Sequence, residues 1–570
     1  MRRAKPAELA QLSASRKGME LMRLFLSSLL GAASVLGSLA LTGCGGISDC
    51  GDDSARCSTM LNENADKCAI AYQLKQGEEK RKNCENAVKV IQKSQAKAAL
   101  PGLIAMVKAP DGAAPDDKHR VEAAKALGAI GDKSAVDPLI EALDPSAGTS
   151  GDPRDKNANN SNEAFAEVLG NLGEKKACTK LLEAMKKSRH DFTVLKAIRA
   201  LGMLECKEAV TPLAEVATKH DHKFVRKNAI VALGDIGDVS AVEPLIFMMF
   251  VEMQGVSFYP EASFALFQVG PSAAEGLLNL MSMKNEQVNK YFEKTGGLKE
   301  TAIKAKAGFV LGDLRDQRAV DPLIDAFKNA AKGDPVLAVY ASAPLGVLGD
   351  KRAVPVLKDQ MLNVDASQRD PIMRALVMLG DRSVVPDMIK GMTVPSFVEG
   401  CMKLGVDKEA CSEDKSARFG AQKAAVDHAS NLGGAQNAEA FKKVIADEKE
   451  PEIKKYMEER AVRLDAAVEC NADAACWVKK LSDANAFVRE KAAWELMWLK
   501  DKSTEDALIK ALGDKDNYVR SAAIFAYWSF GAKKAIPAIE KQLKDDEGAA
   551  TYVRVNQDLK RLLVALRRQG

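Results

Sequence analysis

Histidines are the residues of this sequence that could most directly hold a metal ion or move a proton near neutral pH. The chain contains His119, His190, His220, His222 and His428. His220-Asp221-His222 is the one cluster among them whose spacing could bind a metal ion. It lies directly before an expected helix that starts with Phe-Val-Arg226, where polar turn residues occur in any case. We therefore predict no metal site and no catalytic histidine.

Motifs for nucleophilic, phosphate-binding or zinc chemistry are absent from the sequence. It contains no Gly-x-Ser-x-Gly elbow, no phosphate-binding P-loop and no His-Glu-x-x-His pair. Its repeated Leu-Gly-Asp triplets lack the preceding strand that a glycine-rich cofactor loop needs. The sequence therefore predicts a protein that is not an enzyme, with no cofactor and no evident small-molecule substrate.

The chain has eleven cysteines, and ten of them fall into local groups. These groups are Cys50, Cys57, Cys68 and Cys84; Cys178 and Cys206; Cys401 and Cys411; and Cys470 and Cys476. Local pairing is typical of an oxidising compartment. The Cys-x2-Cys spacing that would indicate a zinc site is absent from the sequence. We predict five structural disulfides, with the pairing of the first four cysteines open among three connectivities.

The eleventh cysteine, Cys44, ends a segment with the properties of an export signal. Residues 24–41 form an apolar run that follows basic residues and contains several serines, which is typical of a secretory signal rather than a membrane span. The sequence Leu41-Thr42-Gly43-Cys44 resembles the lipobox of bacterial lipoproteins. This resemblance implies cleavage between Gly43 and Cys44, a diacylglycerol thioether on Cys44, and a further acyl chain such as palmitate. Two or three acyl chains anchor a protein stably to a bilayer.

The surroundings of the lipobox refine this prediction. The long basic region before the apolar run leaves Met1, Met19 and Met22 open as the true start. By analogy with lipoprotein sorting in Gram-negative bacteria, Gly45 after the lipidated cysteine favours the outer membrane. We expect a lipid-anchored protein of the cell envelope, on the periplasmic or the surface face.

The charge balance bears on nucleic-acid binding. The chain has 82 basic and 78 acidic residues, and its first 43 residues hold six basic and two acidic ones, so 76 of each remain beyond them. Binding to a phosphate backbone requires clustered, uncompensated lysine and arginine. We therefore expect no nucleic-acid partner.

From about residue 120, one sequence pattern recurs along the chain. An apolar-periodic helix ends in Leu-Gly-x-x-Gly-Asp, and Ala-Val-x-Pro-Leu-Ile then opens a second helix. The best copies are 126–143, 232–249, 310–327, 344–361 and 375–392. The pattern resembles the short HEAT-like repeats of the bilin-lyase type. This resemblance implies an all-α solenoid, a right-handed superhelix of about 11–12 helical hairpins.

Residues within the pattern have local structural reasons. Gly131 supplies the left-handed conformation that ends the first helix, Asp132 can cap the second helix, and Pro138 fits its opening turn. Arg226, Arg489 and Arg520 each follow an aspartate by a few residues: Asp221, Asp483 and Asp516, respectively. In HEAT proteins such pairs link adjacent repeats in a ladder, although capping and surface charge are an alternative interpretation.

The repeats and their interruptions predict an organisation for the whole chain. We expect a signal at 1–43, a flexible tether at 44–60, a Cys-rich helical hairpin cap at 61–93, repeats at 94–392, a disulfide-containing insert at 393–418, repeats at 419–550 and a capping helix at 551–570. Further inserts are expected at 144–162 and 284–300. The basic amphipathic C-terminal helix could instead bind a membrane or a partner. Trp494, Trp498, Tyr527 and Trp528 are either core or a binding surface.

The function that these features favour is a non-catalytic, membrane-tethered scaffold for protein–protein interaction in the bacterial cell envelope. We expect the second helices to line the concave side of the solenoid and to bind an unidentified protein or peptide there. One alternative is a cofactor-handling or lyase-type HEAT-repeat enzyme, because bilin lyases share this repeat type. A second alternative is a structural or assembly factor of the outer membrane.

Overall fold

The computed structural model places most of the chain. It describes residues 46–73, 77–108, 118–145, 160–295, 300–333, 335–364, 369–403 and 405–568. The predicted signal with Gly43 and Cys44, and most of the predicted loop 144–162, lie outside these ranges. The regular structure in them is helical, apart from a hairpin of β1 (Glu252–Met253) and β2 (Val256–Ser257). This confirms the prediction of an all-α solenoid.

The helices fall into two regions. The first region, called the arm here, comprises α1 (Ser54–Gln73), α2 (Glu78–Ser94), α3 (Leu100–Lys108), α4 (Lys118–Ile130), α5 (Val136–Ala142), α6 (Asn160–Leu172), α7 (Cys178–Lys187), α8 (Asp191–Met203), α9 (Val210–Lys219), α10 (Lys223–Ile236) and α11 (Val242–Met248). The second region, called the ring, comprises α12 (Tyr259–Val269), α13 (Ala274–Met281), α14 (Glu286–Thr295), α15 (Glu300–Asp313), α16 (Val320–Gly333), α17 (Pro335–Leu348), α18 (Val354–Asn363), α19 (Arg369–Leu379), α20 (Val385–Gly391), α21 (Val394–Lys403), α22 (Lys408–Glu413), α23 (Lys415–Leu432), α24 (Ala438–Asp447), α25 (Pro451–Cys470), α26 (Ala474–Lys480), α27 (Ala486–Leu499), α28 (Glu505–Ala511), α29 (Asn517–Phe530), α30 (Ile536–Asp545) and α31 (Val553–Arg568). None of these described helices is both long and apolar enough to cross a bilayer.

Each repeat is built from the local chemistry of its motif. At the end of α10, Gly237 adopts a left-handed conformation with φ 68°, which a residue with a side chain rarely tolerates. The Asp238 carboxylate then accepts a hydrogen bond of 2.9 Å from the backbone N–H of Ser240. This bond opens a short 3-10 turn, Val239–Ala241, from which α11 continues with Pro244 in its first turn.

The repeat geometry begins at α2. Gln95 takes the left-handed position at the end of α2 with φ 55°, and the 3-10 turn Lys97–Ala99 leads into α3. The helix that covers this first repeat is α1, and the disulfide Cys68–Cys84 joins it to α2. The apolar face of the first repeat is therefore capped, as a solenoid end requires.

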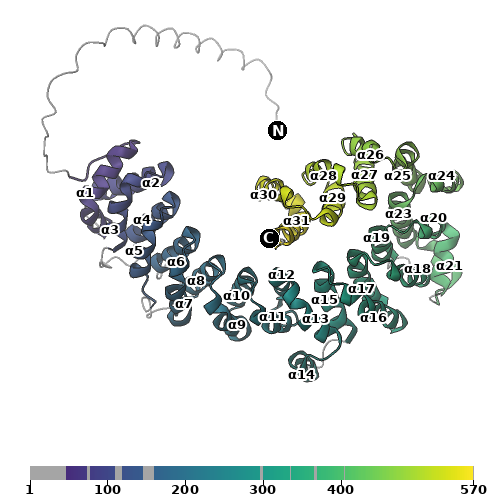
Figure 1. The fold of residues 1–570 in the computed structure, drawn as a ribbon, viewed down its shortest axis with the longest axis horizontal. Coiled ribbons are helices and arrows are strands. Elements are labelled where there is room, and N and C mark those ends of the chain that lie inside the picture. Colours follow the sequence, from purple (N-terminus) through teal and green to yellow (C-terminus); the bar gives the residue numbers. More distant parts are fainter. Residues whose placement is uncertain are drawn as a thin grey trace, which may run out of the picture.

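The first helix of each repeat lines the concave side, so the expectation that the second helices would do so is wrong. Figure 1 shows α4, α6, α8, α10 and α12 on the inner side of the arc, and α5, α7, α9, α11 and α13 on the outer side. The physical reason is the helical glycine of the motif. A Cβ on Gly202 in α8 would lie 2.9 Å from the Ala232 Cα in α10, and one on Gly170 in α6 would lie 3.0 Å from the Ala200 Cα in α8. These glycines let successive first helices approach closely, so the layer that they form is the more tightly curved one.

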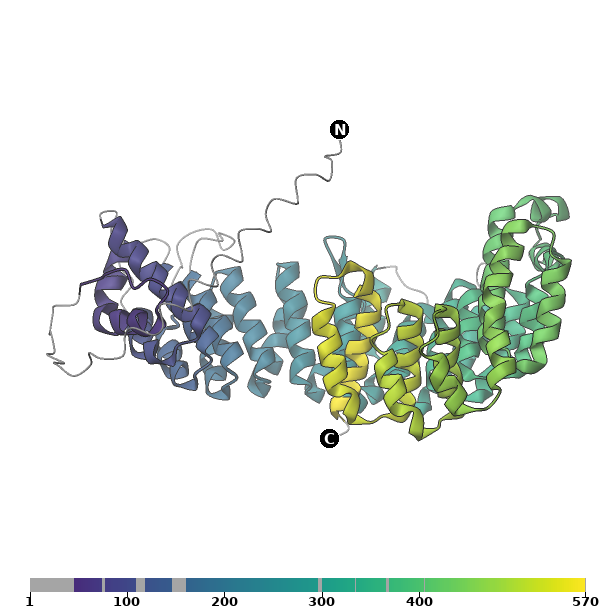
Figure 2. The same cartoon turned by 90° about the horizontal axis from the view of Figure 1, so that it is seen from above.

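The ring closes on itself through α31 (Figures 1 and 2). The Arg561 guanidinium of α31 lies 3.1 Å from the Asp313 carboxylate at the end of α15. Arg568 donates a hydrogen bond to the backbone carbonyl of Phe267 in α12. The predicted C-terminal cap therefore covers the last repeat with one face and contacts the middle of the chain with another.

Candidate functional site

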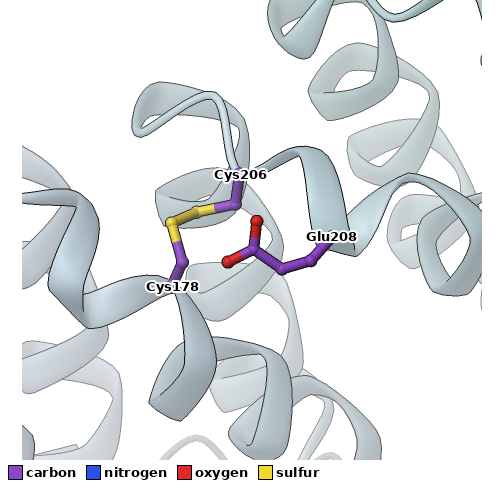
Figure 3. Close-up of side chains that lie close together, drawn as sticks. All are labelled: Cys178, Cys206 and Glu208. Atoms are coloured by element: carbon purple, nitrogen blue, oxygen red, sulfur yellow. A yellow bond between two sulfur atoms is a disulfide. The ribbon is translucent and has the colours of Figure 1, made fainter.

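The cysteines of the described chain are bonded in pairs. The disulfides are Cys50–Cys57, Cys68–Cys84, Cys178–Cys206, Cys401–Cys411 and Cys470–Cys476. Cys178 begins α7 and Cys206 lies just before α9, so this bond joins two neighbouring repeats (Figure 3). The structure thus places these sulfur atoms in cross-links that fasten helices.

Two groups of side chains in the described residues have the spacing of a metal site. They are Cys178, Cys206 and Glu208, and Glu469, Cys470 and Cys476. Figure 3 shows the Glu208 carboxylate beside the bond between the Cys178 and Cys206 sulfurs. A cysteine binds metal as a thiolate, and sulfurs bonded to each other cannot take that form. Both groups are therefore structural disulfides beside a carboxylate.

The histidine cluster singled out in the sequence forms a turn. The backbone N–H of His222 donates to Nδ1 of His220 at 3.1 Å, directly before α10. His428 lies elsewhere, on the inner side of the ring, with its Nε2 atom 2.8 Å from the Asp370 carboxylate. This hydrogen bond holds the pKa of Asp370 below its usual value. The fold places His428 in the lining of a cavity described below.

An aspartate–arginine ladder is present, but its aspartates differ from those predicted. Arg489 in α27 binds both carboxylate oxygens of Asp514, at 2.8 and 2.9 Å, and Arg520 in α29 binds Asp546 at 2.6 Å. Each of these aspartates lies in the turn before the next first helix. Asp516, one of the predicted partners, instead caps α29 through the backbone N–H of Tyr518. The ladder joins successive repeats, while of the predicted aspartates only Asp516 caps a helix.

A network of charged side chains lies on the inner side of the ring. Asp427 in α23 accepts hydrogen bonds from the Tyr456 hydroxyl at 2.6 Å, from Arg460 at 3.3 Å and from Arg463 at 3.2 Å, all three in α25. Arg463 also pairs with Glu490 in α27 at 2.5 Å. Burial alone would lower the pKa of the Arg463 guanidinium, but the Glu490 and Asp427 carboxylates outweigh it and raise the pKa. Three helices are thus joined by paired charges.

Lys491 forms a second, deeper part of this network. Its side chain is completely buried, and its ammonium donates to the backbone carbonyls of Asn431 at 2.5 Å and Gly433 at 2.7 Å. Glu495 lies 2.7 Å from the same ammonium and 2.6 Å from the guanidinium of Arg382, which follows α19. Burial lowers the pKa of Lys491 to about 8. Because every donor is occupied and water is excluded, Lys491 fastens α27 to α23.

Aromatic and arginine side chains give this region a cavity of about 250 Å³, called the inner cavity here. Arg460 stacks between Tyr456 and Phe487, with its guanidinium carbon 3.5 and 4.3 Å from the two ring centroids. Trp494 stacks on Phe525 with centroids 6.0 Å apart. The cavity is lined by Asp370, Arg374, Val377, Met378, Asp427, His428, Asn431, Tyr456, Arg460, Arg463, Ala486, Phe487, Glu490, Trp494, Asp516, Tyr518, Ser521 and Phe525.

The polar cluster of the inner cavity could not be predicted from the sequence. Asp427, Arg463 and Glu490 come from three different helices, so no local motif could reveal them. A signal was present in α27, where Glu490, Lys491 and Glu495 occupy buried positions of a helix that also carries Ala492, Ala493 and Leu496. Charges on the core face of a helix indicate partners from elsewhere in the fold.

A second, larger cavity lies where α31 meets α12 and α15. It has a volume of about 890 Å³ and is called the closure cavity here. Its lining is Val231, Tyr259, Pro260, Glu261, Ser263, Phe264, Gln268, Ala302, Ala305, Lys306, Phe309, Val310, Asp313, Gln557, Lys560 and Arg561. Burial raises the pKa of the Asp313 carboxyl to about 6, although Arg561 beside it acts in the opposite direction. This cavity exists because the ring closes.

Comparison with protein families identifies the repeats. A model of HEAT repeats matches residues 194–249 and 475–554, and a model of the PBS lyase HEAT-like repeat matches residues 120–145 and 303–329. The fold is an α-solenoid, and over these residues it contains HEAT and HEAT-like repeats. Comparison with the sequences of curated proteins finds no match.

Solved structures with similar folds are distant from this chain. Yeast importin-β (Kap95p) is 11% identical with a TM-score of 0.41, covering 90% of this chain and 83% of its own. The CpcE–CpcF complex of phycocyanin lyase from Nostoc is 22% identical with a TM-score of 0.24, covering 44% of this chain and 100% of its own. Human deoxyhypusine hydroxylase is 17% identical with a TM-score of 0.19, covering 53% and 99%, respectively. At these TM-scores, the similarities carry no argument about function.

Proposed function

We propose that this protein is a non-catalytic scaffold of the bacterial cell envelope, held on a membrane by lipid on Cys44, and that it binds a segment of another protein in the inner cavity. The observation that carries the binding proposal is the lining of that cavity. Tyrosine, tryptophan and arginine are the side chains most enriched at the centres of protein interfaces, and here they come from four helices, α19, α25, α27 and α29. Tyr518, at 68% exposure, stands open to a partner.

The charges of the inner cavity support a protein partner over a nucleic acid. Asp427 and Glu490 neutralise Arg460 and Arg463, so no uncompensated basic surface faces the cavity. Nucleic-acid binding depends on such a surface. A protein segment that supplies apolar contacts, with both charge signs at its edges, fits this lining.

Site-specific photo-crosslinking tests the binding proposal. A photoreactive amino acid replaces Tyr518 in the inner cavity or, as a matched control, Val239, which is 59% exposed and lies in a turn far from that cavity. We expect one dominant protein adduct from position 518 in intact cells and none from position 239. Equal adducts at both positions, or none at 518, would contradict the proposal.

Lipidation is tested separately. Cys44→Ala should abolish labelling by a clickable fatty acid and should move the protein from the membrane fraction to the soluble fraction. Unchanged membrane attachment would contradict the anchor but would leave the crosslinking result intact.

The enzyme alternative is tested on protein purified from its own membranes, where a stoichiometric pigment or metal would favour a cofactor-handling role. A role as an assembly factor would instead show as loss of outer-membrane proteins in a deletion strain.

A further inference from the structure

The closure cavity has the size of a small-molecule site. Its volume of about 890 Å³ lies within the roughly 300–1,000 Å³ that is typical of ligand pockets. Helices α12 and α15 form its floor, and α31 supplies a wall through Gln557, Lys560 and Arg561. This cavity is separate from the inner cavity on which the proposed function depends.

The lining of the closure cavity is mostly apolar. Ala302, Ala305, Phe309 and Asp313 follow one stripe of α15, which extends for about 16 Å at a rise of 1.5 Å per residue. Three of these four side chains are apolar, and the carboxyl stands at the far end. An extended alkyl chain matches an apolar surface of this length.

The charges of the closure cavity favour an anion. The carboxylates of its lining already have cationic partners: Asp313 with Arg561 at 3.1 Å, and Glu261 with Lys227 at 2.6 Å. Lys306 is held by the Met249 carbonyl at 3.1 Å and lies 4.9 Å from the Tyr259 ring, with no carboxylate attached. Lys560 is exposed and makes no ion pair with another described residue. The lining therefore holds three cations and two carboxylates, an excess of one positive charge, and Lys306 and Lys560 are the cations without a carboxylate partner among the described residues.

We propose that the closure cavity binds a long-chain carboxylic acid, with its alkyl chain along α12 and α15 and its carboxylate beside Lys560. A neutral alcohol would leave the lysine charge uncompensated, and a cationic amphiphile would be repelled by it. Because α31 supplies one wall, a bound acid stabilises the closed ring over the open one by mass action. This inference does not depend on a protein partner in the inner cavity.

The test is photolabelling of the full chain in its own membranes with a diazirine derivative of hexadecanoate, followed by mapping of the labelled peptides. We expect label on α12, α15 or α31, displaced by excess hexadecanoate but not by hexadecanol or a hexadecyl ammonium salt. Lys560→Glu should lower the labelling about tenfold, as expected for loss of a charge-assisted contact. Ala302→Trp, which fills the cavity, should abolish it.

The matched control is Lys544→Glu on α30, an exposed lysine outside the cavity lining. Labelling by this variant should equal that of the unaltered protein. Helix content measured by circular dichroism shows whether each variant is folded. Label spread over the arm, equal displacement by hexadecanol, or full labelling of Ala302→Trp would each overturn the proposal. The Tyr518 crosslink is read independently, so failure of one proposal is distinguishable from failure of the other.

Discussion

The arm and the ring use the same repeat but are held together in different ways. In the arm, cross-links between repeats reach the adjacent repeat: the Cys178–Cys206 disulfide, and ion pairs such as Lys133–Glu174 at 2.5 Å. In the ring, side chains also join helices that are far apart in sequence. Arg382 and Glu495 are 113 positions apart, and Arg568 and Phe267 are 301 positions apart.

This difference changes how each region should respond to damage. A solenoid whose repeats contact only their neighbours unfolds locally, with a stability that is nearly a sum of repeat and interface terms. A closed ring adds contacts that are all lost when it opens. Mutations in the arm should therefore act on adjacent repeats, and mutations of cross-ring contacts should act at two distant places.

The largest effect is expected from Lys491→Met. It removes a buried cation and leaves Glu495 with one partner fewer, and breaking a buried ion pair costs about 3–5 kcal/mol. Hydrogen exchange should show lost protection in α19 and α23 as well as in α27. Lys442→Met, which breaks the exposed pair with Asp465, is the control and should change stability little. Protection lost in α27 alone would contradict cross-ring coupling.

A comparable but local effect is expected in the arm from the double variant Cys178→Ser with Cys206→Ser. The bond closes a segment with a sequence separation of 28, for which the chain-entropy model gives about 3–4 kcal/mol. Denaturant unfolding monitored by hydrogen exchange should show destabilised α7–α9 and an unchanged ring. Simultaneous loss of protection in α27 and α31 would show that arm and ring form one cooperative unit.

A smaller local effect is expected from Gly202→Ala. The new Cβ would lie 2.9 Å from the Ala232 Cα, so α8 and α10 must separate, at about 1–3 kcal/mol. The control is Gly391→Ala, whose added Cβ would lie 3.6 Å from the Ala425 Cβ in ordinary contact. Small-angle scattering should show a less curved arm for Gly202→Ala. An unchanged curvature would contradict the account of why first helices line the concave side.

The smallest effect concerns pH and ring closure. Closure buries Asp313, so its carboxyl pKa of about 6 exceeds the 3.8 of an exposed aspartate, and the closed form binds a proton more tightly. Closure is therefore most favoured at a pH below both pKa values, where Asp313 is protonated in the closed and in the open ring. The closed ring loses stability as the pH rises from 3.8 to about 6. Above that range, the full cost of burying the charged carboxylate opposes closure. Arg561, Arg315 and Asp558 also face Asp313, and the pKa of Asp558 is itself raised by burial.

Hydrogen exchange of α31, corrected for the intrinsic pH dependence, measures this closure. The equilibrium constant for opening of the ring at α31 should increase between pH 4.5 and pH 7. Asp313→Asn should make this increase smaller. Asp545→Asn on the exposed side of α30 is the matched control. An opening constant that falls with pH in the unaltered protein would reverse the assigned sign.

The positions of the helices could be predicted from the sequence, whereas their interior contacts could not. The hydrogen-bond partners of Gly237 and Asp238 lie within four residues of them, so the motif alone determines the turn that they form. The Asp427, Arg463 and Glu490 cluster depends on three helices whose relative placement no local pattern contains. The same holds for Asp514 and Asp546, which replaced the predicted ladder aspartates because the arginines reach forward to the following turn.

The sequence by itself determined the repeat, its caps and its helical period, because these depend on hydrogen bonds and side-chain spacing within one hairpin. The tertiary structure decided which helices face inward and that the chain closes at α31. Curvature adds up over the repeats between α15 and α31, so the helix spacing at positions such as Gly312 and Gly346 helps to set the final position of Arg561 beside Asp313. The two cavities depend on this accumulated curvature, so no sequence pattern within a single repeat predicts them.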